Sequence, residues 1–444
     1  MNLSAFKAYD IRGKYPEEVN EELAYLVGRA IVRYLAAKII VVGRDMRLSS
    51  PSLANKLIEG IICEGAEVVN IGLCTTPMLN FSVGKYGYDG GVMVSASHNP
   101  GSDNAFKIID KNVSQLSDFE GLNDIKQLIQ TGFKDCINKP GSVLEKSVLN
   151  DYIDHIKTTI GEIGPLNVIA DYGNGVGAIS ASPVFKSLGI KVNELYSEPD
   201  GDFPNHPANP HDAVNFNDLI SQVIKNKADL GIFFDGDADR AIMVDDLGRI
   251  VPVDLLTVLL AQQELAIKKS GKVYYDLRFS KVVPTLLKQS GGIPVMMRVG
   301  NPFYKKVLRE NGGIMGAEFS GHIMFPENYN MDDGLFAALK TMKLICQRGK
   351  KLSELIDDVT VFVASPEISI EAKNPATVFD RIIAAFPDGQ QIELDGVYLD
   401  FYDGFISVRR SNSEFQLIRI RIEAESAEIL QYRLDKVKQI ITEG

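Results

Sequence analysis

The sequence contains little of what would identify a secreted, zinc-binding or nucleic-acid-binding protein. Its 444 residues include four cysteines and five histidines, with no CxxC, HxxxH or HExxH spacing among them. A formal net charge of −11 disfavours general nucleic-acid binding. We expect buried thiols in a reducing cytoplasm, rather than disulfides or zinc ligands, at Cys63, Cys74, Cys136 and Cys346.

Long apolar runs are also missing. No stretch approaches the roughly 20 residues that a membrane span needs, and the beginning, MNLSAFKAYDIRG, lacks the apolar core of a signal peptide. We therefore expect a cytoplasmic protein with no membrane and no nucleic acid among its partners. Because the chain is too long for one ordinary core, we also expect several domains.

A weak internal repeat organises most of the chain. Three times, an apolar strand ends in a loop, a helical pattern closes on a glycine, and a glycine-led apolar run ends in a second, polar loop. Alternating strands and helices of this kind predict mostly parallel sheets. The tail differs, because residues 417–422 alternate strictly between apolar and polar side chains and predict a half-exposed, antiparallel strand.

We therefore predict an α/β protein with three similar α/β domains, whose sheets are mixed and mostly parallel, and a C-terminal α+β domain, arranged around a central cleft. The first three domains would contribute the polar loops SASHNP, DGDADR and AEFSGH in this order, and the fourth would contribute the loop RRSNS. The expected domains are residues 1–145, 146–247, 248–363 and 364–444.

The first polar loop follows a predicted buried strand at residues 91–94. Loops at strand ends are where open α/β sheets place their chemistry. This loop offers the hydroxyl of Ser97 and the imidazole of His98, and the ammonium of Lys107 follows a few residues on. A helix N-cap or an Asx turn is the structural alternative for the same residues.

The second loop places three carboxylates, Asp235, Asp237 and Asp239, at alternate positions after an apolar run. Two unit charges about 4 Å apart repel by roughly 4 kcal/mol at an effective dielectric constant near 20, so a divalent cation would explain the cluster. An EF-hand does not fit, because its sixth position is Arg240 and its twelfth is Asp246. A solvated acidic turn remains the alternative.

The third and fourth loops carry groups that suit a phosphorylated sugar. Glu318, Ser320 and His322 could hydrogen-bond sugar hydroxyls, although a structural turn explains them equally well. Guanidinium, hydroxyl and amide groups suit a phosphate dianion, and a basic hairpin turn is the alternative. The fourth loop supplies these groups from Arg409, Ser411, Asn412 and Ser413.

The motifs AYDIRG, SASHNP, DGDADR, GAEFSGH and RRSNS occur in this order between Phe6 and about Ala424. In them the chain resembles the α-D-phosphohexomutase family, and most closely its bacterial phosphomannomutase/phosphoglucomutase branch. The glucosamine branch usually reads GEQSGH where this chain has AEFSGH. Asn301 stands where the family often has a histidine, and Arg278 stands where a lysine is usual.

The resemblance implies a reversible conversion of hexose 1-phosphate into hexose 6-phosphate, with mannose and also glucose as the sugar. An enzyme phosphoserine and a hexose 1,6-bisphosphate intermediate would carry the phosphoryl group. Mg²⁺ would be the cofactor, hexose 1,6-bisphosphate the activator and small-molecule sugar phosphates the partners of a monomer or homodimer. Alternatives are a phosphoglucosamine mutase, a Mg²⁺-dependent sugar phosphatase with an aspartyl nucleophile, and a non-catalytic phosphosugar-binding protein.

The resemblance also implies roles for individual residues. Ser97 would be the phosphoserine, and its phosphate oxygen would hold Mg²⁺ together with Asp235, Asp237 and Asp239. The catalytic residues would be Ser97, His98, Lys107, Arg240, Arg12 and His322. The substrate-binding residues would be Tyr9, Arg278, Glu318, Ser320, Arg409, Ser411, Asn412 and Ser413.

Overall fold

The computed structural model describes residues 3–136, 139–372, 374–411 and 416–443. The chain divides into two units. The first unit contains Met1–Val251, Lys305–Asn311 and Ser320–Glu354. The second contains Pro252–Tyr304, Gly312–Phe319 and Leu355–Gly444. The third stretch of the predicted repeat is therefore shared between the two units.

The first sheet belongs to the first unit. Its elements are β1 (Ile11–Lys14), α1 (Glu21–Leu35), β2 (Ile39–Arg44), α2 (Ser50–Cys63), β3 (Glu67–Leu73), α3 (Thr76–Tyr86), β4 (Gly90–Val94), β5 (Asp103–Asp110), α4 (Leu122–Thr131) and β6 (Val143–Glu145). The strands lie in the order β1-β5-β4-β2-β3-β6. The pairs β4–β2, β2–β3 and β3–β6 are parallel. Strand β5 is antiparallel to both β1 and β4.

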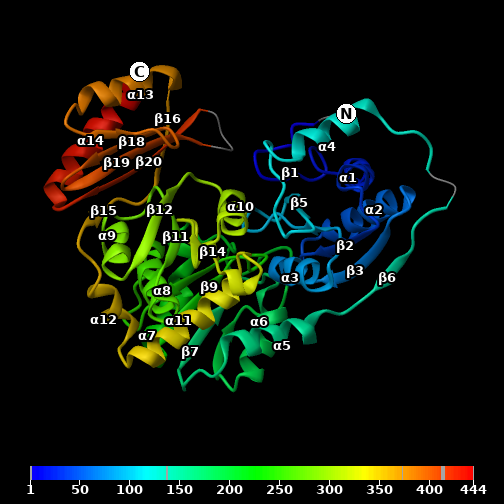
Figure 1. Ribbon diagram of the computed structural model, residues 1–444, viewed down its shortest axis with the longest axis horizontal. Helices are drawn as coiled ribbons and strands as arrows, with labels where there is room; N and C mark the ends of the chain where they lie inside the picture. The colour runs from blue at the N-terminus through cyan, green and yellow to red at the C-terminus, as the bar shows by residue number, and fades with distance from the viewer. Residues whose placement is uncertain (1–2, 137–138, 373, 412–415, 444) are drawn as a thin grey trace. The chain divides into compact units, whose positions relative to one another are not determined.

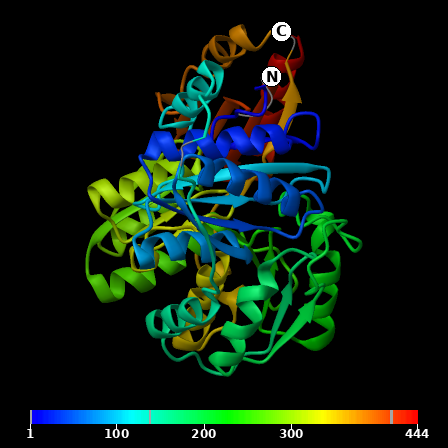
Figure 2. The ribbon, with the colours of Figure 1, turned by 90° about the vertical axis from the view of Figure 1, so that its right-hand side faces the viewer.

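Helices cover both faces of this sheet, and Figure 2 shows blue helices above and below the blue strands. Side chains of a strand alternate between the two faces. Ile40 and Val42 of β2 join the core formed with α1, α2 and α4, whereas Gly43 lies against Leu79 of α3. An apolar stripe on each face explains why a continuous run of buried residues forms β2.

The second sheet also belongs to the first unit. Its elements are α5 (Leu149–Ile160), β7 (Val168–Asp171), α6 (Gly177–Ser187), β8 (Val192–Leu195), η1 (Ala213–Phe216), α7 (Asn217–Asn226), β9 (Leu230–Phe234) and β10 (Ala241–Val244). The strand order is β10-β9-β7-β8, and only β10 is antiparallel. Later parts of the chain complete this unit with β14 (Ile323–Met324), η2 (Pro326–Asn328) and α11 (Gly334–Arg348). Helix α11 packs on β9 and β10.

The second unit contains a parallel sheet and an antiparallel one. Its elements are α8 (Val253–Lys268), β11 (Gly271–Asp276), α9 (Val282–Gln289), β12 (Gly292–Met297), β13 (Met315–Ala317), β15 (Val363–Ala364), β16 (Ile368–Glu371), α13 (Pro375–Ala385), β17 (Gln390–Ile392), β18 (Val397–Phe401), β19 (Gly404–Arg410), β20 (Leu417–Ala424) and α14 (Ala427–Glu443). Strand β11 pairs in parallel with β12 and β13. The residues of two helices are divided between the units, those of α10 (Asn301–Asn311) and those of α12 (Leu352–Asp357).

The antiparallel sheet has the order β15-β20-β19-β18-β17, and β16 also pairs with β20. Helices α13 and α14 cover one face of this sheet (Figure 1). The antiparallel prediction for residues 417–422 is confirmed, but the polar face of this strand is not exposed throughout. Arg421 is buried because its guanidinium pairs with Asp254 at 3.1 Å.

The predicted fold class is confirmed, with three α/β domains that have mixed, mostly parallel sheets and a C-terminal domain with an antiparallel sheet. Of the helices that the structure describes, none combines the length and the apolar composition that crossing a membrane requires.

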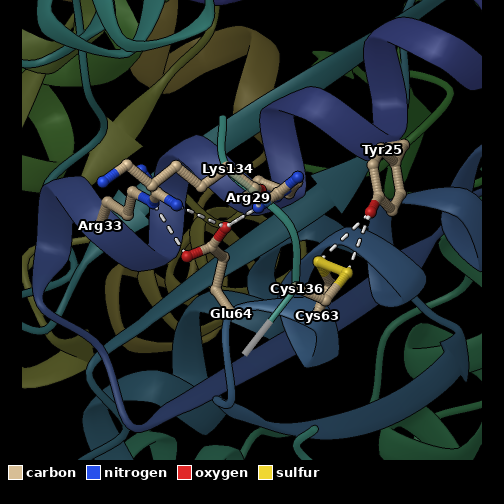
Figure 3. The surroundings of a disulfide bond; sticks show 7 residues. All are labelled: Tyr25, Arg29, Arg33, Cys63, Glu64, Lys134 and Cys136. Carbon is tan, nitrogen blue, oxygen red and sulfur yellow. Dashed lines mark hydrogen bonds and ion pairs between the residues drawn. A yellow bond between two sulfur atoms is a disulfide. The ribbon is translucent and has the colours of Figure 1, made fainter. Parts of the chain in front are cut away.

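The prediction of four buried thiols is wrong for two of the cysteines. Cys63 at the end of α2 forms a disulfide with the exposed Cys136 (Figure 3). The two residues are 73 positions apart, so sequence spacing gave no sign of the pairing. Cys74, which is buried, and Cys346, which is half-buried, are free.

Polar contacts surround the disulfide on α1 and α2. The Tyr25 hydroxyl donates to Cys63 Sγ at 3.2 Å, and Glu64 accepts from both Arg29 and Arg33 (Figure 3). Arg29 also donates to the carbonyl oxygen of Lys134, two residues before Cys136, at 2.6 Å. The segment after α4 is therefore attached to α1 and α2 by hydrogen bonds as well as by the disulfide.

Candidate active site

Ser97 lies in the loop that follows β4, and its side chain is buried. Its backbone has a φ of +54°, a left-handed conformation that costs a non-glycine residue about 1–2 kcal/mol. The Ser97 amide donates to the Ser95 hydroxyl at 3.0 Å. A loop held in such a conformation indicates that surrounding contacts fix the position of the hydroxyl.

Arg47 provides the main contacts that hold this loop. Its guanidinium is fully buried and pairs with Asp45 at 3.0 Å. It donates to four backbone carbonyl oxygens, at distances from 2.5 to 2.8 Å, which belong to Ser97, Asn99, Pro100 and Asp103. Sequence reasoning missed Arg47, although it lies two residues after the GRD segment at the end of β2.

The predicted carboxylate loop meets the serine loop. The Ser97 hydroxyl donates to Asp235 Oδ2 at 2.6 Å. A side chain at Gly236 would place its Cβ 2.3 Å from the Ser97 carbonyl oxygen, so only glycine allows this approach. The two loops, 138 positions apart in sequence, therefore form one cluster within the first unit.

The three carboxylates fit a hard divalent cation. Asp235, Asp237 and Asp239 each offer an oxygen, and these oxygens lie within 4.8 Å of one another. Asp237 Oδ1 and Asp239 Oδ1 are buried without a hydrogen-bond partner, which is costly unless a cation or water fills the place. Carboxylate oxygens in this number are the ligands that Mg²⁺ takes in proteins. The donor set therefore fits Mg²⁺.

Lys107 and Thr76 contact the same carboxylates. The Lys107 ammonium lies 2.5 Å from Asp237 Oδ2 and 2.7 Å from Asp239 Oδ2. The Thr76 hydroxyl, at the start of α3, donates to Asp237 Oδ2 at 2.6 Å. Burial would raise the pKa of Asp237, but Lys107 lowers it to about 2. Asp237 is therefore ionised and available to a cation.

Arg240 joins the serine to the histidine beside it. It donates from Nε to Asp235 Oδ2 at 2.9 Å and from Nη2 to the Ser97 hydroxyl at 3.2 Å. Nη2 also donates to His98 Nδ1 at 2.5 Å, so the neutral ring of His98 carries its hydrogen on Nε2. Burial and the charge of Arg240 lower the pKa of His98 well below its usual value. Arg240 can therefore neutralise charge that develops at Ser97.

Burial raises the pKa of Asp235 to about 6, against the opposing charge of Arg240. A positive partner therefore helps to keep Asp235 ionised.

Arg12, in β1, also contacts the loop that carries Ser97. It pairs with Asp10 at 2.6 Å and donates to the Ala96 carbonyl oxygen and to Asn99 Oδ1. Tyr9 is half-buried, and its ring lies 6.4 Å from that of Phe119. Arg12 is therefore part of the cluster around Ser97.

His322 is the last residue of the third polar loop and lies near the carboxylate cluster of the first unit. Its Nδ1 lies 2.8 Å from Asp332 Oδ2 and 3.9 Å from Asp239 Oδ1. Burial opposes protonation, but Asp239 and Asp332 raise the pKa of His322. Ser320, two residues earlier, is half-buried in the same unit. His322 and the carboxylate cluster are thus neighbours.

The remaining predicted residues lie in the second unit. Glu318 accepts from the Gly300 amide at 2.9 Å and lies 3.7 Å from the Arg278 guanidinium. Glu367 Oε1 accepts from Arg278 at 3.0 Å and from Arg409 at 3.1 Å.

These contacts bring together three of the four predicted substrate-binding side chains that the structure describes in this unit, Arg278, Glu318 and Arg409. Ser411 is buried and its amide donates to Leu417, whereas Asn412 and Ser413 lie outside the described residues. Asn301, the residue in place of the family's histidine, begins α10.

Other contacting residues were not anticipated from the sequence. Thr76, Asp332 and Glu367 contact the predicted residues without belonging to any of the four motifs. His211 Nε2 lies 3.3 Å from Arg240 Nη1. None of these four residues carries a local sequence pattern that could have indicated its place.

Strand-end loops bring together a buried hydroxyl, three carboxylates, a lysine and two arginines. Such groups suit phosphoryl transfer, a reaction in which positioning and charge neutralisation do most of the catalysis. Profiles described as phosphoglucomutase/phosphomannomutase, alpha/beta/alpha domains I, II and III, match residues 3–135, 150–248 and 253–362. The chain belongs to the phosphoglucomutase/phosphomannomutase family, which confirms the resemblance to phosphohexomutases.

Individual relatives match nearly the whole chain. It is 34% identical to a phosphoglucomutase of Neisseria gonorrhoeae, over 98% of this chain and 96% of the relative. It is also 34% identical to a phosphomannomutase/phosphoglucomutase of Pseudomonas syringae pv. tomato, over 98% and 93%. A crystal structure of a phosphoglucomutase/phosphomannomutase family protein from Burkholderia thailandensis has a TM-score of 0.90, 29% identity and coverage of 99% and 97%.

Proposed function

We propose that this chain is a phosphohexomutase that interconverts hexose 1-phosphates and hexose 6-phosphates, with mannose and also glucose as the sugar. The observation that carries the proposal is the Ser97 hydroxyl, buried and 2.6 Å from Asp235 within the carboxylate cluster. Names of relatives include both phosphoglucomutase and phosphomannomutase, which supports the two sugars.

Ser97 would carry the phosphoryl group in the resting enzyme. The group passes from Ser97 Oγ to the free hydroxyl of the bound hexose phosphate, which gives a hexose 1,6-bisphosphate, and the other phosphate then returns to Ser97. Arg240, which donates to the Ser97 hydroxyl, would neutralise charge on the moving group. His98 and Lys107 would neutralise charge or move protons beside it, with Arg12 and His322 at the edges of the cluster.

Asp235, Asp237 and Asp239 would hold Mg²⁺ together with a phosphate oxygen on Ser97. When bound, Mg²⁺ supplies positive charge at the phosphoryl group. Hexose 1,6-bisphosphate would act as an activator, because it can phosphorylate Ser97.

Other predicted residues would bind the rest of the substrate. Glu318 and Ser320 would contact sugar hydroxyls. Arg409, Ser411, Asn412 and Ser413 would grip the phosphate that is not reacting, and Tyr9 and Arg278 would also bind the substrate. We also propose a cytoplasmic location and a monomer or homodimer.

Turnover of α-mannose 1-phosphate, α-glucose 1-phosphate and α-glucosamine 1-phosphate, with Mg²⁺ and a trace of glucose 1,6-bisphosphate, tests the proposal. We expect activity on the first two sugars and little on the third. A strong preference for glucosamine 1-phosphate would make the chain a phosphoglucosamine mutase. Release of free phosphate without isomerisation would instead indicate a phosphatase.

Replacing the nucleophile tests the central residue directly. Ser97→Ala should lose nearly all turnover while it keeps its fold, because the variant loses only the hydrogen bonds of this hydroxyl with Asp235 and Arg240, each worth about 1 kcal/mol. Ser102→Ala, in the same loop but exposed, is the control and should keep its activity. Retained turnover in Ser97→Ala would remove the phosphoserine from the mechanism.

A further inference from the structure

A buried chain of charges stands behind His322. Asp332 is fully buried and uses its two oxygens for different partners. Oδ2 lies 2.8 Å from His322 Nδ1, and Oδ1 lies 2.6 Å from the Lys305 ammonium, which is itself buried. All three residues belong to the first unit, like the carboxylate cluster.

The backbone on both sides of Asp332 is fixed. Asp332 forms an antiparallel bridge with Met324, the last residue of β14. The next residue, Asp333, caps α11 by accepting from the Phe336 amide at 3.0 Å. Asp333 also accepts from the buried hydroxyl of Tyr152 at 2.7 Å. The Asp332 carboxylate therefore sits on a rigid support, which is what orienting another side chain requires.

The carboxylate determines how the imidazole of His322 is arranged. Although burial raises it, Lys305 and His322 hold the pKa of Asp332 well below its usual range, so the carboxylate is ionised. An ionised carboxylate only accepts hydrogen bonds, so Nδ1 of His322 must carry the hydrogen. The ring plane is thereby fixed, and Nε2 is the nitrogen left for other partners.

Stability alone does not explain the arrangement. Burying an ammonium and a carboxylate costs desolvation energy that their attraction repays only in part. The group formed by Asp239, His322 and Asp332 could hold a second metal ion by distance alone. However, the Lys305 ammonium already provides the positive charge at Asp332, which disfavours a cation there.

We propose that Asp332, held by Lys305, is a positioning residue for phosphoryl transfer, which acts by fixing the orientation of the His322 ring beside Asp239. This inference rests on the proposed function. Asp332 itself need not contact the substrate. Its loss should therefore lower kcat and leave KM nearly unchanged, the pattern of an interaction that matters in the transition state.

The test begins with Asp332→Asn, whose side chain has the same shape but no charge. An amide can present a donor to His322 and so permits the wrong tautomer. We expect kcat to fall by about 10- to 100-fold, the usual effect of losing such a partner. Glu327→Gln is the matched control, because it breaks an acid–lysine pair with Lys340 at 2.7 Å nearby and should keep kcat.

A double variant separates positioning from charge balance. Lys305→Met combined with Asp332→Asn removes both buried charges, so it also serves if the single variant folds poorly. If Asp332 only balances Lys305, this double variant should recover wild-type kcat. The proposal requires that its unfolding temperature recovers while kcat stays low.

A mutant cycle with His322 completes the test. In a His322→Ala background, Asp332→Asn should add little further loss, because the two residues act as one unit. The proposal is wrong if Asp332→Asn keeps wild-type kcat, if the charge-balanced double variant recovers it, or if the two losses multiply in full. A wild-type enzyme without turnover of any sugar phosphate would instead refute the proposed function itself.

Discussion

The Arg47 guanidinium donates from Nη2 to the carbonyl oxygen of Ser97 at 2.8 Å. It thus fixes the backbone of the residue proposed to carry the phosphoryl group. Three further carbonyl oxygens of the same loop accept from the same guanidinium. A planar group with five N–H donors in fixed directions suits this task, and an ammonium does not.

Arg47→Lys should therefore keep the positive charge but lose the planar set of N–H donors. An ammonium has three donors for the Asp45 carboxylate and the four carbonyl oxygens, so at least two of these five acceptors would lack a donor, which costs roughly 2 kcal/mol or more of the free energy of unfolding. Urea denaturation measures this loss, and labelling with glucose 1,6-bisphosphate measures how fast Ser97 is phosphorylated, which should also slow. Arg44→Lys, at a half-buried position with one backbone acceptor, should change neither quantity much. Equal effects of the two substitutions would show that the Arg47 hydrogen bonds do not hold the loop that carries Ser97.

Mg²⁺ should stabilise the protein independently of catalysis. A ligand that binds only the folded state at 100 times its Kd adds about 2.7 kcal/mol to the free energy of unfolding. We expect Mg²⁺ to raise the unfolding temperature of the wild type and EDTA to reverse the increase, with NaCl of equal ionic strength as the control. Asp239→Asn should show little of the increase. The same increase in Asp239→Asn would place the cation elsewhere.

His206 should make the stability of the first unit depend on pH. Its Nε2 lies 3.1 Å from Asp171 Oδ2, and its ring stacks on Phe233. Burial lowers the pKa of His206, but the hydrogen bond and charge of Asp171, with a smaller effect of Asp218, raise it above its usual value. A raised pKa in the folded state means that the stabilisation is complete at low pH and is lost as the pH rises through the folded value.

The comparison of wild type with His206→Gln measures this dependence. We expect the wild type to exceed the variant in free energy of unfolding at about pH 5.5, below the unperturbed pKa, and the difference to shrink by about pH 8.5. Urea denaturation at both pH values gives the two differences. A difference that is constant or grows with pH would show that protonation of His206 does not stabilise the fold.

Reduction of the Cys63–Cys136 disulfide should lower stability without changing the fold. The bond closes a loop of 73 residues, and the chain-entropy estimate for such a loop is about 4 kcal/mol. Hydrogen bonds from Arg29 also hold the segment, so the fold should persist after reduction. Thermal unfolding with and without dithiothreitol measures the change. Cys63→Ser should remove the response to dithiothreitol, and Cys346→Ser should retain it.

The sequence allowed the loops to be predicted better than the contacts between them. Short apolar runs ending in polar residues marked β4 and β9, and the alternate spacing of Asp235, Asp237 and Asp239 indicated a cation. Both signals are local. The contacts of Arg47 span 50 or more positions, and Asp332 lies 27 positions from Lys305. No periodicity connects residues so far apart, because only the folded backbone brings them together.

The prediction of free thiols at Cys63 and Cys136 was wrong for a related reason. Their spacing excluded the local patterns of a metal site, but a disulfide depends on where the chain returns in space. The segment after α4 returns to the end of α2, and nothing in its composition announces this.

The sharing of the third stretch of the chain between two units has a consequence for inheritance. Residues 253–362 match one family domain, yet Lys305, His322 and Asp332 belong to the unit that contains Asp239. An exchange of this domain between related genes as a single cassette would import these three side chains next to a foreign carboxylate loop. Recombination within the family should therefore succeed most often when residues 253–362 and the carboxylate loop come from one parent. The sequences of these two parts should also diverge together.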